Sequence, residues 1–116
     1  MEGKQNPLFL KADLLAKNIY KVSALFPKNE QYGLTSQLRR AGLSVILNIV
    51  EGFARQSKKE FRRFLIMSFG SLKETKYLLY FAKEQKYLID KTHDEVFSLS
   101  EEVARLLWAT IKKLDC

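Results

Sequence analysis

The sequence has very few residues that form disulfides, interrupt helices or bind metal ions. Its 116 residues include one cysteine, Cys116, one histidine, His93, and two prolines, Pro7 and Pro27. A lone cysteine cannot close an internal disulfide, so Cys116 indicates a reducing compartment and is expected to be a solvated thiol. No second histidine or cysteine is spaced to share a metal ion with His93, which argues against a zinc site. We expect no metal and no other cofactor.

Long apolar runs are also absent. No stretch reaches the ~20 apolar residues that a membrane-spanning helix needs. The nearest, residues 41–50, contains Ser44 and Asn48. The N-terminal residues MEGKQNPLFLKADLL have too little uninterrupted apolar sequence for a secretory signal. We therefore expect a cytoplasmic protein with no membrane partner.

Motifs of the common enzyme classes are missing. The sequence has no G-x-S-x-G nucleophile motif and no phosphate-binding glycine loop. His93 stands beside Asp94 near a predicted helix start, which is typical of a solvated polar residue. Glu51 and Glu60 are separated in sequence and flanked by cations, which does not suit proton transfer near neutral pH. We expect no enzyme activity and no small-molecule substrate.

What the sequence does have is apolar residues at helical spacing, most densely in residues 34–65. One face of a helix over 34–53 carries Leu38, Ala41, Gly42, Val45, Ile46, Ile49 and Phe53. The far side carries Leu43, Leu47 and Val50, and only a narrow polar stripe remains. A helix that is apolar on nearly all sides is usually buried. In a chain this small, that pattern predicts that another subunit supplies part of the cover.

Three further segments have the same period. Pro7 suits the start of the first helix, Pro27 ends it, and Thr35 is a suitable N-cap for the second. Capping boxes at Ser57–Glu60 and Thr92–Glu95 predict the starts of the third helix, over 58–86, and the fourth. These four amphipathic helices with short connections predict one all-α domain over 1–116, an antiparallel up-down-up-down four-helix bundle. Their inner faces are predicted to carry Ala12, Leu15, Ile19, Val22, Phe26, Phe61, Phe64, Leu65, Ser68, Phe69, Leu72, Thr75, Leu79, Ala82, Val96, Leu99, Val103, Leu106, Leu107, Ile111 and Leu114.

A second apolar seam runs along the third helix, opposite the core. Gly70 in mid-helix should cost about 1 kcal/mol relative to alanine, and it lies on the same outward face as Ile66, Tyr77 and Phe81. We expect a neighbouring subunit to pack there, with Gly70 allowing close approach. The alternative is apolar residues scattered on the surface of a monomer. The predicted subunit interface therefore comprises Leu43, Leu47, Val50, Ile66, Gly70, Tyr77 and Phe81.

Asn48, Glu51 and Arg55 follow one another along the polar stripe of the second helix. The order Glu51 then Arg55 at i, i+4 favours an ion pair. We expect Asn48 and Glu51 to belong to a buried polar network that fixes helix or subunit register, because buried polar groups need partners. A polar contact surface is the alternative.

Basic residues are concentrated in one part of a chain whose net charge is +7. Residues 57–87 hold eight Lys or Arg against three Glu, whereas residues 88–116 hold four against six acidic residues. Cations at the start of a helix oppose its dipole and repel one another, so fold stability does not explain them, whereas a phosphate backbone would. Because the sequence has no aromatic RNA-recognition motif, such binding should depend on the phosphate backbone and the shape of the nucleic acid. The candidate nucleic-acid residues are Arg39, Arg40, Arg55, Lys58, Lys59, Arg62 and Arg63.

The segments LTSQLRR, NIVEG, SKKEF and GSLKE, within residues 26–88, resemble a known family. This family comprises the four helix bundle proteins related to reading frames in intervening sequences of 23S ribosomal RNA genes. The resemblance implies an antiparallel bundle that assembles as a ring, a homopentamer, with no established enzyme activity. More distant bundle proteins that accompany diversity-generating retroelements are basic pentamers that bind nucleic acid and a reverse transcriptase. The chain departs from the family pattern at Ile46 and Leu47, where a proline and a small polar residue are common.

Two hypotheses follow for function. The first is a non-enzymatic homo-oligomeric bundle that binds RNA or DNA, structured RNA foremost, through the basic residues. The second is a protein–protein scaffold that docks an acidic partner and has no nucleic-acid role. The basic residues could also form a solvated face that keeps an oligomer in solution.

Overall fold

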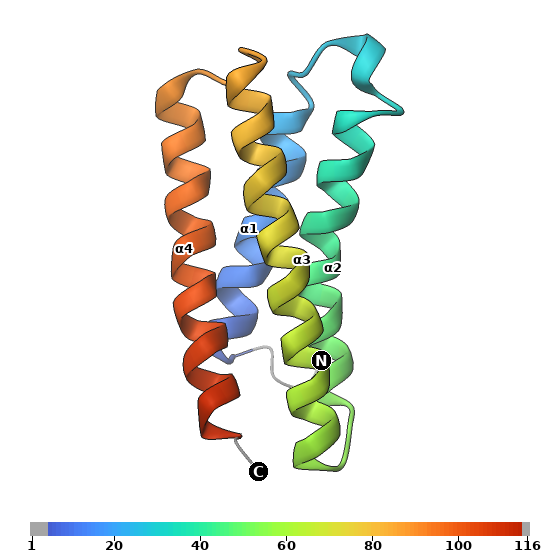
Figure 1. Cartoon of the computed structure of the whole chain (residues 1–116), viewed down its shortest axis with the longest axis vertical. Helices are drawn as coiled ribbons and strands as arrows, with labels where there is room; N and C mark the ends of the chain where they lie inside the picture. The colour runs from blue at the N-terminus through green and yellow to red at the C-terminus, as the bar shows by residue number, and fades with distance from the viewer. Residues whose placement is uncertain (1–4, 115–116) are drawn as a thin grey trace.

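A computed structural model describes residues 5–114 of the chain; Cys116 lies outside the described residues. The described part contains helices α1 (Pro7–Ser23), α2 (Leu34–Phe53), α3 (Lys58–Glu84) and α4 (Asp90–Lys113), with a short 3-10 helix η1 (Lys28–Glu30) before α2. The four long helices run side by side in alternating directions (Figure 1), and each packs against two neighbours. The predicted all-α, up-down-up-down four-helix bundle is confirmed.

The inner faces of the helices form the core much as their spacing predicts. Burying each such aliphatic side chain contributes about 1.5–3 kcal/mol, so these faces hold the bundle together. Phe61, Phe69, Leu99 and Leu106 are half-buried at its margin. The large side chains that are fully buried include Leu15, Ile19, Leu38, Ile49, Leu65, Leu72, Leu79 and Leu107.

Polar residues on the inner face of α3 have hydrogen-bond partners. The hydroxyl of Ser68 donates to the carbonyl of Val45 at 2.7 Å, which ties α3 to α2 inside the core. Thr75 donates to the Ser71 carbonyl one turn earlier at 2.8 Å. These bonds allow small hydroxyl side chains to lie among leucines without a desolvation penalty.

Two glycines bring α2 close to its neighbours. A Cβ atom at Gly42 would lie 2.7 Å from Cδ1 of Ile19 on α1. A Cβ atom at Gly52 would lie 2.9 Å from Cδ1 of Phe61 and 3.3 Å from Cβ of Phe64, both on α3. A larger residue at Gly52 would press against the start of α3, whereas at Gly42 the terminal methyl of Ile19 would have to rotate away.

The start of α2 differs from the prediction that Thr35 is its N-cap. The N-cap position is two residues earlier, at Gly33, so the helix begins at Leu34 and Thr35 is buried. The Leu34 N–H donates to Oε1 of Glu30 at 3.0 Å. The carboxylate of Glu30 in η1 therefore caps the start of α2 in place of the Thr35 hydroxyl.

One of the two predicted capping boxes is only half formed, and the other is wrong. Ser57 Oγ accepts from the Glu60 N–H at 3.0 Å, as predicted, but the Glu60 carboxylate binds Arg63. Helix α4 begins at Asp90 rather than at Thr92, after Ile89, which has no capping side chain.

The earlier start of α4 also overturns the prediction that His93 is solvated. His93 is only 7% exposed and shares the buried face of α4 with Val96 and Ser100. Its ring stacks on Phe97 with centroids 5.4 Å apart, and its Nδ1 lies 3.1 Å from a carboxylate oxygen of Asp94. Among the described residues, its Nε2 is buried without a hydrogen-bond partner.

Helix α3 ends at Glu84, two residues before the predicted Lys86. Lys86 adopts a left-handed backbone, with φ of 64°, and the Tyr87 N–H returns to the Ala82 carbonyl at 2.9 Å. This is the usual way to end a helix, but the left-handed position is more often occupied by glycine.

Candidate nucleic-acid interface

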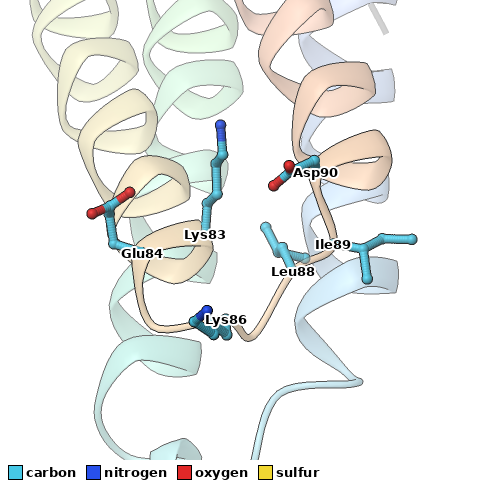
Figure 2. A pocket seen from close by; sticks show the side chains of 6 residues that line it. All are labelled: Lys83, Glu84, Lys86, Leu88, Ile89 and Asp90. Atoms are coloured by element: carbon cyan, nitrogen blue, oxygen red, sulfur yellow. The ribbon is translucent and has the colours of Figure 1, made fainter.

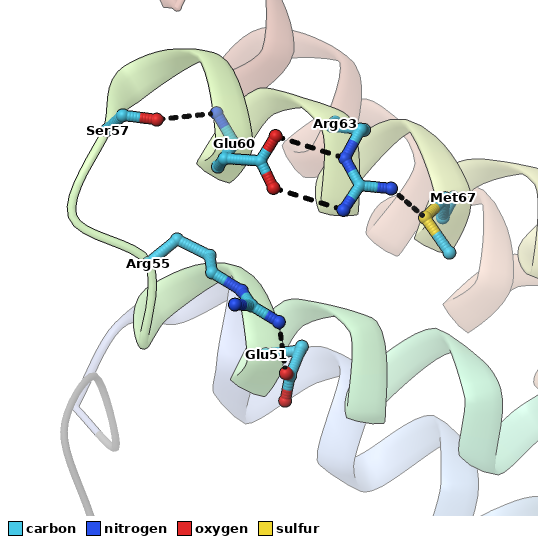
Figure 3. Close-up of polar contacts among 6 residues, drawn as sticks. All are labelled: Glu51, Arg55, Ser57, Glu60, Arg63 and Met67. Atoms are coloured by element: carbon cyan, nitrogen blue, oxygen red, sulfur yellow. Dashed lines mark hydrogen bonds and ion pairs between the residues drawn. The ribbon is translucent and has the colours of Figure 1, made fainter.

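The turn between α2 and α3 gathers five of the predicted basic residues. Lys58 and Lys59 are exposed on the first turn of α3, and Arg62 and Arg63 follow on its second turn. Arg55 lies in the turn itself, close to the start of α3 (Figure 3). The sequence prediction that a tight turn places Arg55 beside the α3 cations is confirmed.

Two of these arginines share one aromatic ring. The guanidinium carbons of Arg55 and Arg63 lie 4.7 and 4.6 Å from the ring centroid of Phe64, which is 8% exposed. Each contact is a cation–π interaction. Phe64 thus positions two like charges near one another while the arginines cover its ring.

Carboxylates pair with both arginines. Arg55 binds Oε1 of Glu51 at 2.6 Å, and Arg63 binds Oε1 of Glu60 at 3.1 Å (Figure 3). The hydrogen bond from Arg63 lowers the pKa of the Glu60 carboxyl. Glu60 therefore remains ionised at neutral pH. A guanidinium carries five N–H donors, so each arginine keeps donors for another anion.

Arg62 links this region to α4. Its Nε lies 3.4 Å from the carbonyl oxygen of Ile111, in the last turn of α4. The exposed Lys112 and Lys113 follow directly and so lie at the same end of the bundle. We call this end, made of Arg55, Lys58, Lys59, Arg62, Arg63, Lys112 and Lys113, the basic end.

Sequence reasoning missed Lys112 and Lys113 as candidate binding residues. They are about 50 positions beyond Arg62 in the chain. At the end of a helix, lysines are readily explained by the helix dipole alone. The predicted antiparallel order was the available signal, because it places the end of the fourth helix beside the start of the third.

The structure does not bring Arg39 and Arg40 to the basic end. They lie in the first turns of α2, and at 1.5 Å per residue Arg39 is about 21 Å along the helix axis from Phe53, where α2 ends before Arg55. Arg39 donates to Oγ of Ser23 at 2.9 Å and to the Tyr20 carbonyl at 3.1 Å, and it covers the Tyr20 ring. Its contacts are those of a cap on the end of α1. Arg40 is exposed on the opposite part of α2 from the basic end.

The predicted polar network separates into two parts. Asn48 donates to the Ser44 carbonyl at 2.8 Å and to its hydroxyl at 3.1 Å, and the Ser44 hydroxyl lies 2.8 Å from that of Ser71. This chain joins α2 to α3. Glu51 instead pairs with Arg55, and their side chains are 50% and 41% exposed. Within one subunit, Glu51 is therefore not part of a buried network.

The predicted interface residues lie mainly on the outer faces of α2 and α3. Leu47 and Tyr77 are each 59% exposed, and Leu43, Ile66 and Phe81 are also exposed. A Cβ atom at Gly70 would have no neighbour within 4 Å, so nothing within the subunit requires glycine there. Val50 differs, because it is half-buried and packs against the core.

Several hollows in the surface of residues 5–114 lie away from the basic end, and two of them are compared with it. One, of about 320 Å³, lies between α1 and α2 and is lined by Asp13, Ala16, Lys17, Tyr20, Leu43 and Ile46. The other, of about 580 Å³, lies where α3 turns into α4 (Figure 2). Its charged residues are Lys83, Glu84, Lys86 and Asp90, so neither sign of charge predominates.

Within residues 5–114, no three acidic, histidine or cysteine side chains lie close enough together to hold a metal ion. The same residues include no helix of the length and hydropathy required to span a bilayer.

Comparison with known proteins places this bundle in a family. The family model described as 23S rRNA-intervening sequence protein matches residues 4–109. The chain belongs to this family. The resemblance seen in LTSQLRR, NIVEG, SKKEF and GSLKE is thereby confirmed. No curated protein matches the chain.

A solved structure supports the fold of this 23S rRNA-intervening sequence family member. It is a protein of unknown function from the S23 ribosomal protein family of Bacteroides thetaiotaomicron, similar with a TM-score of 0.87 at 24% identity. The match covers 94% of this chain and 98% of that one. At this identity the likeness shows the fold alone.

Proposed function

We propose that this chain is a non-enzymatic, homo-oligomeric bundle that binds nucleic acid, structured RNA foremost, through its basic end. The observation that carries the proposal is the basic end itself. Its cations come from the α2–α3 turn with the adjoining start of α3 and from the end of α4, about 50 residues later in the sequence. The carboxylates among them, Glu51 and Glu60, are paired with Arg55 and Arg63.

Fold stability does not account for this concentration of positive charge. Lys58 and Lys59 occupy the first turn of α3, where the helix dipole disfavours cations. Both are exposed, and within residues 5–114 neither side chain has a hydrogen bond or an ion pair. A phosphate backbone would relieve the repulsion, and each phosphate neutralised would release bound counterions. The presence of several such groups at one end favours a polyanion over a single small anion.

Assembly is proposed from two different apolar surfaces. The outer seam of α3 exposes Ile66, Tyr77 and Phe81, whereas Leu43 lines a hollow between α1 and α2. Contacts between unlike surfaces of identical subunits are heterologous and close into rings when the rotation permits. A homopentamer is the assembly that the family resemblance implies, and a ring would multiply the contacts to one nucleic acid.

The test compares two sets of lysine substitutions in filter binding with an RNA hairpin. The first set replaces Lys58, Lys59, Lys112 and Lys113 with glutamine. The control set replaces Lys21, Lys28, Lys86 and Lys91, exposed lysines near the other end of the bundle. The unmodified protein should retain RNA at 50 mM salt and lose most of it by about 200 mM.

The first set should reduce the slope of log affinity against log salt by about 3, since each lost phosphate contact removes roughly 0.7–0.9. The control set should leave the slope nearly unchanged. Equal losses in both sets would show attraction to overall charge and would contradict a site at the basic end. Capture of an acidic protein from nuclease-treated lysate, with no RNA retention, would instead support the scaffold hypothesis.

A further inference from the structure

One large aromatic side chain stands on the outer surface of α4, close to the basic end. Trp108, the single tryptophan of the chain, is 53% exposed. Its ring packs on Phe69 of α3, with centroids 5.8 Å apart and planes tilted by 45°. Phe69 is half-buried, so it supports Trp108 from the protein side and leaves the outer side of the indole open.

Cations surround this tryptophan. On α4, Arg105 and Lys112 lie three residues before and four after Trp108, on the neighbouring turns, and both are exposed. On α3, the ammonium group of Lys73 lies 5.3 Å from the centroid of the Phe69 ring. The carboxylate of Glu101, two turns earlier on α4, is paired with Lys76 at 3.0 Å. The charge around the open indole is therefore positive.

The α4 cations Arg105 and Lys112 distinguish Trp108 from the apolar seam of α3, whereas Lys73 is near both. Flanking cations would weaken the packing of this ring against a second copy of the chain, because that copy would also be positively charged. An exposed ring between cations is the arrangement by which proteins hold single-stranded nucleic acid: the ring stacks on a base and the cations follow the backbone. A base within a duplex cannot offer its face in this way, since both faces are already stacked.

We infer that Trp108 is a base-stacking platform for single-stranded RNA or DNA, continuous with the basic end through Lys112 and Arg62. This inference rests on the proposed nucleic-acid function and specifies its substrate class as an unpaired segment. Phe69 acts as the positioning residue beneath the indole. The sugar is not distinguished, because a stacking contact is made with the base alone.

Because Trp108 is the only tryptophan, its fluorescence reports directly on the site. Titration with (U)12 or with (dT)12 at about 50 mM salt should quench the emission, whereas a 12-base-pair blunt RNA duplex should bind with little quenching. Trp108→Leu should weaken binding of both single strands by about 5- to 150-fold, the equivalent of a 1–3 kcal/mol stack. Trp108→Phe should recover most of the affinity, because phenylalanine keeps an aromatic face.

The matched control is Tyr32→Leu, which removes an aromatic side chain that is 91% exposed between α1 and α2. It should leave single-strand affinity unchanged. Binding of the duplex and the single strands without quenching, and with Trp108→Leu unaffected, would overturn this inference and leave the basic end intact. Binding of no probe would overturn the proposed function itself. A drop in molar mass on Trp108→Leu, measured by light scattering, would show that a second copy covers the indole and would also overturn the inference.

Discussion

The hydroxyl of Tyr87 donates a 2.9 Å hydrogen bond to Oε2 of Glu30. The other carboxylate oxygen of Glu30 accepts the Leu34 N–H at the start of α2. Tyr87 also packs against Phe26, with ring centroids 5.7 Å apart. A single carboxylate therefore joins the α1–α2 connection to the segment that follows α3, at the end of the bundle opposite the basic end.

The first prediction concerns pH. The hydrogen bond to Glu30 raises the pKa of the Tyr87 hydroxyl. A group whose pKa is raised by folding stabilises the fold fully below its unfolded pKa of about 10, and that stabilisation is lost as pH rises through the folded value. Between pH 8 and pH 11, the urea midpoint of unfolding should therefore fall further for the unmodified protein than for Tyr87→Phe.

Tyr32→Phe is the control for this comparison, because Tyr32 is almost fully exposed. It should follow the unmodified protein at both pH values. Parallel pH dependence of Tyr87→Phe and the unmodified protein would show that the Tyr87–Glu30 bond contributes nothing to stability.

The second prediction concerns the end of α3. Lys86 adopts a left-handed conformation that costs a side-chain-bearing residue about 1 kcal/mol and costs glycine little. Lys86→Gly should therefore raise the free energy of unfolding by about 0.5–1 kcal/mol. Gln85→Gly, at the preceding right-handed position, should lower it by a similar amount. The same sign for both variants, measured by urea unfolding, would contradict this account.

The third prediction ranks two glycine contacts. Alanine at Gly52 would meet the Phe61 ring and also the Cβ of Phe64, and that Cβ moves only with α3. Alanine at Gly42 would meet the terminal methyl of Ile19, which can rotate away. Gly52→Ala should therefore destabilise by about 1–3 kcal/mol, and Gly42→Ala by less. Thermal unfolding of both variants gives the order, and the reverse order would contradict close packing of α2 on α3.

The fourth prediction concerns assembly. The unmodified protein should have a molar mass by light scattering several times the 13.5 kDa of one chain. Tyr77→Glu combined with Phe81→Glu should reduce it to one chain, because two carboxylates would replace exposed aromatic rings of the α3 seam. Tyr32→Glu, on a still more exposed ring outside that seam, should not.

Gly70→Leu adds a second test of the same face. Within one subunit nothing opposes a side chain at this position, and leucine favours the helix by nearly 1 kcal/mol. If a neighbouring subunit packs closely here, the Gly70→Leu variant should be a stably folded monomer. If the variant retains the assembled mass, close packing at Gly70 is excluded.

Periodicity alone was enough to predict the four helices and most of the core, but it missed the buried Leu8, Phe9, Ala16, Leu34 and Leu88. Each inner face is long, and residues such as Leu15, Leu38, Leu72 and Leu107 recur at a spacing that no strand could satisfy. Helix ends were predicted less well. The start of α2 depends on Glu30 reaching forward from η1, and the burial of His93 depends on a helix that begins at Asp90 without a capping side chain.

The candidate site could be predicted only where it is local in sequence. Arg55 and the cations of early α3 lie within nine residues, so one turn brings them together. Lys112 and Lys113 required the antiparallel order to be applied to single residues. The sequence alone provided no reason to exclude Arg39 from the candidate site, because its hydrogen bonds to Ser23 and Tyr20 depend on how α1 ends beside α2.

The two ends of the bundle carry different charge, and cyclic symmetry would place all the like ends on the same side of an assembly. In a closed ring with the helices parallel to its axis, every subunit points the same way. All copies of Lys58 and Lys112 would then line one rim, and all copies of the Glu30–Tyr87 bond would line the other. Such a ring would be one-sided: a polyanion would be held on a single surface, and the opposite surface would remain open to a different partner.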